Sequence, residues 1–357
     1  MGDLFRNILR SSESLFKNDV ALDYSFQPKI VPYRENEQRV VAECIKPMFQ
    51  EKNGKNVFIF GQPGVGKTVA CRHILAELEE ETDDIIPVYI NCWQRNTTYK
   101  IILEICDMMD FKFVQNKKTE ELFRWVKQSL NKKSAVFVFD EADKLEDIDF
   151  LYMILEEIYR KTIVIITNYK DWLLELDDRV KSRLMPEAAE FKPYDYEETK
   201  GILKQRMECA FYPNVFSNEA FEIAAKKAFE SKDIRTGLHL MKEAGHIAEE
   251  KSSRKVLLEH ARQALSKSGD FSIKKASDLA TDEQMILELV KGSSGKKIGE
   301  FFRMYQSKGG RLAYKSFQRK IERLGKSRFI SVEKTAGGEE GNTTIIKSNS
   351  EKKLTEF

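Results

Sequence analysis

The chain has 357 residues, of which 41% are hydrophobic and 32% are charged, and its formal net charge is +2. This length predicts two or three domains, and because no run of eighteen apolar, uncharged residues occurs, we expect no transmembrane helix and no membrane partner. The first residues lack a secretory signal and the five cysteines form no CxxC pair, which predicts a cytoplasmic protein with reduced thiols and no zinc site.

Residues 1 to about 30 are polar and weakly patterned, which predicts a partly ordered N-terminal arm. From residue 55 to 192, short apolar runs alternate with longer amphipathic stretches. The expected strands are NVFIF, IIPVYIN, AVFVFD, TIVIIT and EAAEF, and the helix-like stretches between them cover residues 67–80, 97–110, 119–132 and 150–161. Such alternation requires crossover helices between parallel strands, so the predicted fold class is α/β, a parallel sheet sandwiched by helices.

The stretch GQPGVGKT, from Gly61 to Thr68, fits the pattern G-x-x-x-x-G-K-[ST] and lies between an expected strand and an expected helix. Its glycines let backbone N–H groups face phosphates without Cβ interference, and the helix points its N-terminus at the anion. Lys67 is expected to reach the β- and γ-phosphates, and the Thr68 hydroxyl to ligate Mg²⁺. We therefore predict that ATP or ADP binds with Mg²⁺ at Gly61, Pro63, Gly64, Val65, Gly66, Lys67, Thr68 and Val69.

Two acidic residues, Asp140 and Glu141, stand at the end of the run AVFVFD. Ligands of open α/β sheets bind at the carboxyl ends of the strands. Asp140 is expected to hold Mg²⁺, directly or through water, and Glu141 to polarise the attacking water. Acidic pairs after strands also serve as helix caps, but this pair follows the phosphate-binding pattern by about 70 residues, which favours an ATPase site.

The run TIVIIT is followed by Asn168, whose amide can position the water or contact the γ-phosphate; a turn-forming asparagine is the alternative. The segment LDDRVKSRL carries Arg179 and Arg183 before the last strand. An arginine presented to the nucleotide of a neighbouring subunit is a trans finger. Both residues are candidates for this catalytic role, and ordinary surface cations are the alternative.

After Pro193 the strand pattern stops and four amphipathic helices are expected, at residues 196–211, 218–230, 234–250 and 253–267. A polar linker, SGDFSIKKASD, is expected from Ser268. Three more helices, at 281–292, 296–308 and 314–326, and a hairpin at 328–348 follow. The predicted domains are residues 1–192 with the N-terminal arm, 193–270 and 280–350.

The order of these motifs resembles the AAA+ ATPases, which combine a phosphate-binding loop, an acidic pair, a terminal asparagine, a finger arginine and a helical lid. In the lid, KDIRTGLHLMKEAGHIAEE places Arg235 at the start of a helix. The resemblance implies that Arg235 reaches across to the γ-phosphate as a sensor-2 arginine.

More narrowly, FQPKIVPYRENEQ, YINCWQRNTTYKIILEIC and DDRVKSRL are similar to the archaeal replication initiators, over about residues 25 to 345. This resemblance implies that Val31, Pro32 and Arg34 flank the adenine. It also implies that the segment from about Arg95 to Asp107 touches DNA. The chain departs from the family at Tyr33, where a histidine often precedes the arginine.

The C-terminal module concentrates positive charge. Between Lys291 and Ile330 twelve Lys and Arg residues outnumber two acids, a net charge of +10 that leaves −8 for the rest of the chain. This favours a nucleic-acid partner, and a solvated basic surface is the alternative. Three helices and a wing predict a winged helix whose third helix enters the major groove of double-stranded DNA. Phe317, Ile321 and Leu324 form its core face, and the expected DNA-binding residues are Arg311, Lys315, Arg319, Lys320, Arg323, Lys326 and Arg328, with Lys334 in the wing.

We therefore expect a nucleoid-associated ATPase that binds replication-origin DNA and helps recruit or load the replicative helicase. ATP binding and slow hydrolysis would act as a switch, with another initiator copy as a further partner. The alternatives are a clamp-loader subunit, a nucleotide-switched signalling or transposon-targeting ATPase, and a transcription regulator with an inert nucleotide site. A clamp loader predicts a C-terminal bundle of helices instead of a basic winged helix.

Overall fold

The computed structural model describes residues 14–277, 281–293, 295–310, 312–326, 330–335 and 343–348. The chain divides into two compact units, Met1–Leu265 and Ser266–Phe357. A search of the described helices finds none that is long and apolar enough to cross a membrane.

Five strands form one sheet in the first unit, and all five were predicted. They are β1 (Val57–Phe60), β2 (Ile85–Asn91), β3 (Ser134–Asp140), β4 (Lys161–Thr167) and β5 (Glu187–Glu190). Their spatial order is β2-β3-β4-β1-β5, and every pair is parallel. All residues of β1, β3 and β4 are buried, because helices cover both faces of the sheet, and this explains their uninterrupted apolar sequences.

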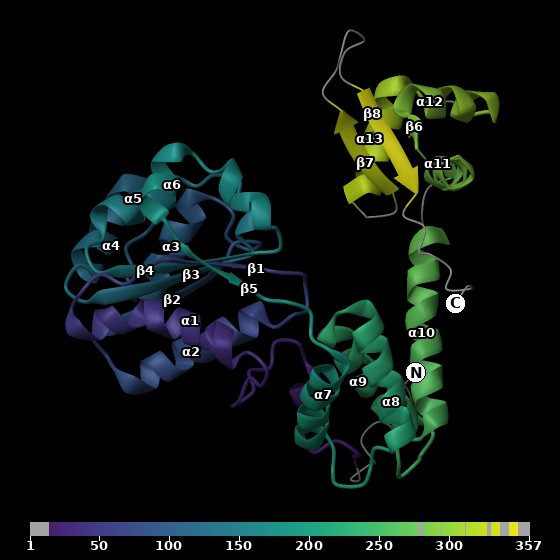
Figure 1. Ribbon diagram of the computed structural model, residues 1–357, viewed down its shortest axis with the longest axis horizontal. Coiled ribbons are helices and arrows are strands. Elements are labelled where there is room, and N and C mark those ends of the chain that lie inside the picture. The colour runs from purple at the N-terminus through teal and green to yellow at the C-terminus, as the bar shows by residue number, and fades with distance from the viewer. Residues whose placement is uncertain are drawn as a thin grey trace, which may run out of the picture. The chain divides into compact units, whose positions relative to one another are not determined.

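The helices lie in two layers (Figure 1). On one face, α1 (Glu35–Ile45) and α2 (Lys67–Glu81) pack against side chains such as Val57, Ile59 and Val138. The other face, with Phe58 and Phe137, is covered by α3 (Thr98–Met108), α4 (Thr119–Leu130), α5 (Asp149–Glu157) and α6 (Asp178–Leu184). Short 3₁₀ helices occur at Asp19–Leu22, Lys46–Gln50, Ala142–Lys144 and Lys170–Glu175. The predicted α/β sandwich is confirmed.

The lid follows β5 and consists of α7 (Tyr196–Ala210), α8 (Asn218–Ser231), α9 (Ile234–Glu250) and the start of α10 (Leu258–Ser277). Each of the first three helices begins at a capping side chain. Asp195 forms a reciprocal capping box with Glu198, and Ser217 and Asp233 accept hydrogen bonds from backbone N–H groups of α8 and α9.

The helix α10 continues to Ser277, through the stretch that the sequence predicted as a linker from Ser268. The linker prediction rested on polar composition, which does not prevent helix formation. The stretch contains no proline, and its single glycine, Gly269, opposes a helix by only about 1 kcal/mol.

Residues 14–26 of the predicted N-terminal arm, which we call the N-terminal strap, pack on the lid. Leu15 and Phe16 are buried in the hydrophobic core of the lid, and the Phe16 ring lies 4.6 Å from the Phe211 ring, centroid to centroid. The Glu249 carboxylate accepts hydrogen bonds from the Ser14 hydroxyl at 2.7 Å and from the Leu15 N–H at 2.8 Å. The only helix of the strap is the short 3₁₀ helix Asp19–Leu22, so its apolar residues follow no α-helix or strand pattern and the sequence did not predict this docking.

The second unit contains α11 (Thr281–Gly292), β6 (Lys296–Lys297), α12 (Ile298–Ser307), α13 (Tyr314–Lys326), β7 (Ile330–Thr335) and β8 (Thr343–Ser348). The strands form an antiparallel sheet in the order β6-β8-β7. Phe317, Ile321 and Leu324 are buried, which confirms the predicted core face of α13. The three predicted helices and the hairpin strands are present, and the short strand β6 was not predicted.

Candidate nucleotide-binding site

The phosphate-binding loop, Gly61–Thr68, has a left-handed backbone that favours glycine at Gly64, with φ +82°, and at Gly66, with φ +87°. A Cβ atom on Gly64 would lie 2.1 Å from Asp233 Oδ1, and one on Gly66 would lie 2.6 Å from the Tyr194 hydroxyl oxygen. Both conformation and close approach of the lid segment therefore require these glycines.

Lys67 is the first residue of α2, and its ammonium group is buried in the loop. Its Nζ donates to the carbonyl oxygens of Gly61 at 2.6 Å and Gln62 at 3.0 Å, and to Asn168 Oδ1 at 3.0 Å. Burial lowers the pKa of Lys67 to about 8, and the nearby Asp140 carboxylate opposes this shift. The structure thus brings together the two predicted residues Lys67 and Asn168.

Asp140 ends β3 and its side chain is buried, yet its carboxylate is well supplied with donors. The Thr68 hydroxyl donates to Oδ2 at 2.6 Å, the Tyr89 hydroxyl donates to Oδ2 at 2.7 Å, and the Glu141 N–H donates to Oδ1 at 2.8 Å. Mg²⁺ prefers oxygen ligands such as hydroxyl and carboxylate groups, so Thr68 and Asp140 fit the predicted metal site.

Glu141 follows in the left-handed region, at φ 56°, and lines the same cavity as Thr68. Burial raises the pKa of its carboxyl, and the negative charge of Asp140 raises it further. A carboxylate with raised basicity in a cavity is suited to polarising a water molecule.

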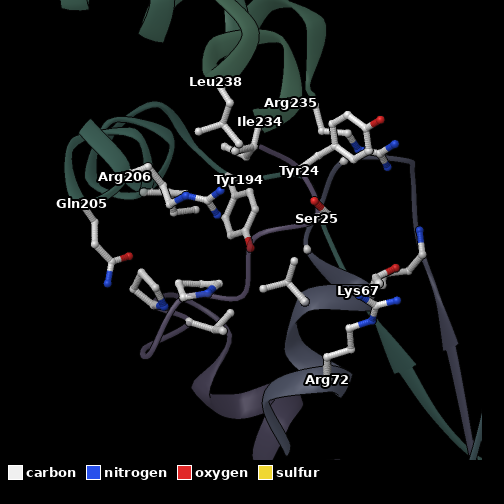
Figure 2. Close-up of a pocket in the computed structure, with 18 of the residues that line it drawn as sticks. Tyr24, Ser25, Lys67, Arg72, Tyr194, Gln205, Arg206, Ile234, Arg235 and Leu238 are labelled. Carbon is white, nitrogen blue, oxygen red and sulfur yellow. The ribbon is translucent and has the colours of Figure 1, made fainter. Parts of the chain in front are cut away.

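A cavity of about 410 Å³ extends from the phosphate-binding loop to the lid. Such a volume is in the usual range for a small-molecule site. Figure 2 shows side chains converging on the cavity from both domains, with Lys67 and Arg72 from α2 and Arg235 and Leu238 from α9. Among the predicted residues, those that line the cavity are Val31, Pro32, Gly64, Gly66, Lys67, Thr68, Val69, Glu141 and Arg235.

Arg34 is not among the lining residues, although the resemblance placed it beside the adenine. Its side chain is buried behind the loop, where Nε donates to the Val65 carbonyl oxygen at 3.1 Å and Nη1 to Glu37 at 2.7 Å. Its guanidinium carbon lies 4.0 Å from the centroid of the Tyr194 ring. In this arrangement Arg34 supports the phosphate-binding loop and Tyr194 from outside the cavity.

The three predicted catalytic arginines have different surroundings. Arg235 lines the cavity, with its Nε 3.7 Å from Asp233 at the start of α9. Arg183 forms a close ion pair with Glu156. Arg179 has a longer ion pair, with its Nε 3.8 Å from Asp177 Oδ1, and its side chain is 79% exposed. Neither α6 arginine lines the cavity.

Sequence reasoning missed several lining residues, among them Tyr89, Tyr194 and Arg72. The position of Tyr89 could have been predicted from strand periodicity. Residues two apart along a strand share a face of the sheet, and Tyr89 lies two residues before Asn91, the end of β2, which pairs with Asp140 of β3. Tyr89 is therefore expected on the same face as Asp140. For Tyr194 and Arg72 the position in the cavity depends on tertiary packing that no local pattern reports.

Of the predicted DNA-binding residues, Lys315 and Arg319 are exposed on α13, and Lys320 is half-buried. Arg323 and Lys326 belong to α13 by their backbone, and Lys334 belongs to β7. Arg311 and Arg328 lie outside the described residues.

Comparison with known proteins identifies the family. A family model described as an AAA domain matches residues 50–173, and a model described as a Cdc6 AAA+ ATPase-type lid domain matches residues 200–266. The ORC1-type DNA replication protein of Pyrococcus furiosus is 32% identical over 287 residues, which are 75% of this chain and 68% of the relative. The chain belongs to the archaeal ORC1-type replication initiator family.

Relatives and solved structures of this family extend over nearly the whole chain. The ORC1-type DNA replication protein 2 of Methanothermobacter thermautotrophicus is 28% identical over 96% of this chain and 94% of its own length. The structure of the Aeropyrum pernix ORC1 protein in complex with DNA matches with a TM-score of 0.74 and 25% identity, covering 95% of both chains. Cdc6p from Pyrobaculum aerophilum, at 18% identity and a TM-score of 0.65, shares the fold over 94% of this chain and 95% of its own. The predicted AAA+ core with its helical lid is thereby confirmed.

Proposed function

We propose that this ORC1-type initiator is a slow, Mg²⁺-dependent ATPase that binds origin duplex DNA and helps recruit or load the replicative helicase. The observation that carries the proposal is the cavity shared by the two domains of the first unit. Lys67, Thr68 and Glu141 approach it from the α/β domain, and Arg235 approaches it from the lid. One bound nucleotide can therefore contact both domains.

In this proposal each residue has one task. The backbone of the phosphate-binding loop and Lys67 bind the phosphates, while Thr68 and Asp140 hold Mg²⁺, which supplies charge neutralisation when bound. Glu141 orients and deprotonates the attacking water, and Asn168 fixes Lys67 and the water. Val31 and Pro32, which line the same cavity, contact the base.

The same geometry supports a switch. Arg235 is a long cation on the lid, so its attraction to a γ-phosphate would favour a closed position of the lid, and this attraction disappears on hydrolysis. The trans finger is assigned to Arg179, because it is far more exposed than Arg183 and lacks a close ion pair. A second initiator copy would receive this finger.

The DNA-binding part of the proposal rests on the second unit. Its three helices and antiparallel strands are arranged in the element order of a winged helix, and α13 carries Lys315 and Arg319 on its exposed side. The Aeropyrum pernix relative is described as a complex with DNA. The antiparallel sheet of this unit does not fit the helical bundle expected of a clamp-loader subunit.

The test is fluorescence anisotropy of an origin-like duplex, measured with ATP, with ADP and without nucleotide, combined with phosphate release. We expect Lys67→Ala to abolish nucleotide binding and Glu141→Gln to bind ATP but lose turnover. Lys127→Ala, which removes a partly exposed ion pair with Glu157 that does not line the cavity, serves as the control and keeps both activities. Wild-type ATP affinity in Lys67→Ala would contradict the site, and DNA binding unaffected by nucleotide in every variant would contradict the switch.

A further inference from the structure

The carboxylate of Asp140 has a hydrogen-bond donor that the phosphate-binding motifs do not include. Tyr89 donates its hydroxyl proton to Oδ2 at 2.7 Å, and the same oxygen accepts the Thr68 hydroxyl at 2.6 Å. Asp140 is only 2% exposed, so these donors replace water around its negative charge.

The sheet places Tyr89 at this position. The strands β2 and β3 are parallel neighbours, and their register pairs Asn91 with Asp140 and Tyr89 with Val138. Paired residues and residues two apart along a strand share one face of the sheet. Tyr89 and Asp140 therefore both lie on the face that α2 covers, where Tyr89 packs against the apolar core.

Arg72, on α2, packs against the tyrosine ring. Its guanidinium carbon lies 4.3 Å from the centroid of the Tyr89 ring, and both residues line the nucleotide cavity. An ordinary phenol is protonated at neutral pH, so the Tyr89 hydroxyl is available as a hydrogen-bond donor to Asp140.

The hydrogen bonds to the Asp140 carboxylate restrict its orientation. Oδ2 has two lone pairs, which Tyr89 and Thr68 use, and Oδ1 accepts the Glu141 N–H. Since the Thr68 proton is directed at Oδ2, the lone pairs of the Thr68 oxygen remain for a metal ion. Without Tyr89, Oδ2 would keep only one partner, and the carboxylate could rotate and release Thr68.

We propose that Tyr89, held by Arg72, is a positioning residue for the Mg²⁺ site: it fixes the Asp140 carboxylate, and through it the orientation of the Thr68 hydroxyl. This inference rests on the proposed nucleotide function and adds to it a residue outside the phosphate-binding loop and the acidic pair. Tyr89 touches neither the reacting water nor the metal in this role. Its effect is on the affinity for Mg²⁺ and not on the affinity for the nucleotide alone.

The test measures metal binding without turnover. Binding of a fluorescent ADP analogue is titrated in EDTA and at a series of Mg²⁺ concentrations, and Mn²⁺ bound to the protein–ADP complex is counted by electron paramagnetic resonance. We expect Tyr89→Phe to raise the Mg²⁺ concentration for half-saturation about tenfold, as loss of an outer partner of a metal ligand commonly does. Binding in EDTA should stay within about twofold of wild type, because the ring and its packing are retained.

Tyr194→Phe is the matched control, because Tyr194 lines the same cavity but contacts Gly66 and Arg34 instead of Asp140. It should change ADP affinity equally with and without Mg²⁺. Arg72→Met, which leaves the Tyr89 hydroxyl in place, should shift the Mg²⁺ dependence in the same direction by a smaller factor. It decides the question if Tyr89→Phe does not fold.

An unshifted Mg²⁺ dependence in Tyr89→Phe, or equal losses of ADP binding with and without metal, would overturn the inference. A wild-type protein that binds no ADP analogue under any condition would instead overturn the proposed nucleotide function. The two failures are therefore distinguishable in one set of titrations.

Discussion

Lys67 and Asn168 meet in the nucleotide site although 101 positions separate them in the chain: Lys67 Nζ donates to Asn168 Oδ1 at 3.0 Å. The contact joins the start of α2 to the residue directly after β4. The strand β4 pairs with β1, which leads into the phosphate-binding loop and α2, so the contact ties these two neighbouring strands together at their carboxyl edge, where ligands of α/β sheets bind.

This contact leads to the first prediction, for Asn168→Ala. The variant should lose about 10²-fold in the hydrolysis rate, a typical effect of removing one donor that acts in the transition state. ADP affinity should change only a few-fold, because Lys67 keeps its bonds to the carbonyl oxygens of Gly61 and Gln62. Single-turnover phosphate release and equilibrium ADP binding measure the two quantities. An unchanged hydrolysis rate would favour the alternative that Asn168 only forms a turn.

Much of the sheet and of the polar residues at its carboxyl edge could be predicted from the sequence. The strands β1, β3 and β4 are buried on both faces, so they appear as continuous apolar runs that local reading detects. The predicted polar residues, such as Asp140 and Asn168, directly end such runs, and parallel strands bring these ends to one edge. Chain order was therefore enough to assemble this part of the site.

Residues whose roles depend on packing between distant segments could not be predicted. Arg34 carries a charge and stands near the adenine-binding segment by resemblance, yet its side chain is 5% exposed and binds the outside of the phosphate-binding loop. The N-terminal strap docks through four buried apolar side chains, Leu15, Phe16, Ala21 and Leu22, yet its only helix is the short 3₁₀ helix Asp19–Leu22. Neither a buried guanidinium nor apolar residues outside an α-helix or a strand give a periodic signal.

The second prediction concerns Arg34→Met. This change removes the hydrogen bond to the Val65 carbonyl oxygen and leaves the carboxylate of Glu37 without its arginine partner. It also replaces the guanidinium that lies against the Tyr194 ring by an uncharged side chain. We expect a loss of about 2–4 kcal/mol in the free energy of unfolding, as for other buried charged networks that lose one partner. ADP affinity should fall too, because the loop is less well supported.

Denaturant unfolding of the first unit measures the change, and Arg39→Met is its control. Arg39 lies on the same helix, α1, but its side chain is exposed, so its replacement should alter stability by less than about 0.5 kcal/mol. Equal stabilities of the two variants would show that Arg34 does not support the loop.

The third prediction tests the docking of the N-terminal strap at Gly245, a buried residue in α9. A Cβ atom at this position would lie 2.3 Å from Phe16 Cζ. Gly→Ala in a helix normally stabilises a protein by about 0.5–1 kcal/mol. Gly245→Ala should instead destabilise the lid by about 1–3 kcal/mol or release the strap, because the ring of Phe16 must move.

A double-mutant cycle with Phe16→Ala isolates this clash. In the Phe16→Ala background the ring is absent, and Gly245→Ala should regain the usual helix stabilisation. Urea unfolding and the rate of proteolytic cleavage in the strap provide the two measurements. If Gly245→Ala is equally destabilising in both backgrounds, Phe16 is not its neighbour in solution.

The fourth prediction addresses DNA binding by α13. Each phosphate contact contributes about 0.9 to the slope of log affinity against log salt concentration, because one counterion is released. Lys315→Ala and Arg319→Ala should therefore each reduce the magnitude of this slope by about 0.9 if the residue binds a phosphate. An arginine that contacts a base edge would behave differently: its replacement would relax sequence preference and cost about 1–3 kcal/mol at one position of the site.

Anisotropy titrations between low and moderate salt, on origin-like and scrambled duplexes, separate these two modes. Lys227→Ala is the control, since Lys227 is an exposed lysine on the lid helix α8, and it should keep the wild-type slope. Loss of slope in the α13 variants on both duplexes indicates phosphate contacts, and loss confined to the origin-like duplex indicates base contacts. Wild-type slopes and affinities in both α13 variants would contradict a DNA-binding role for the exposed side of α13.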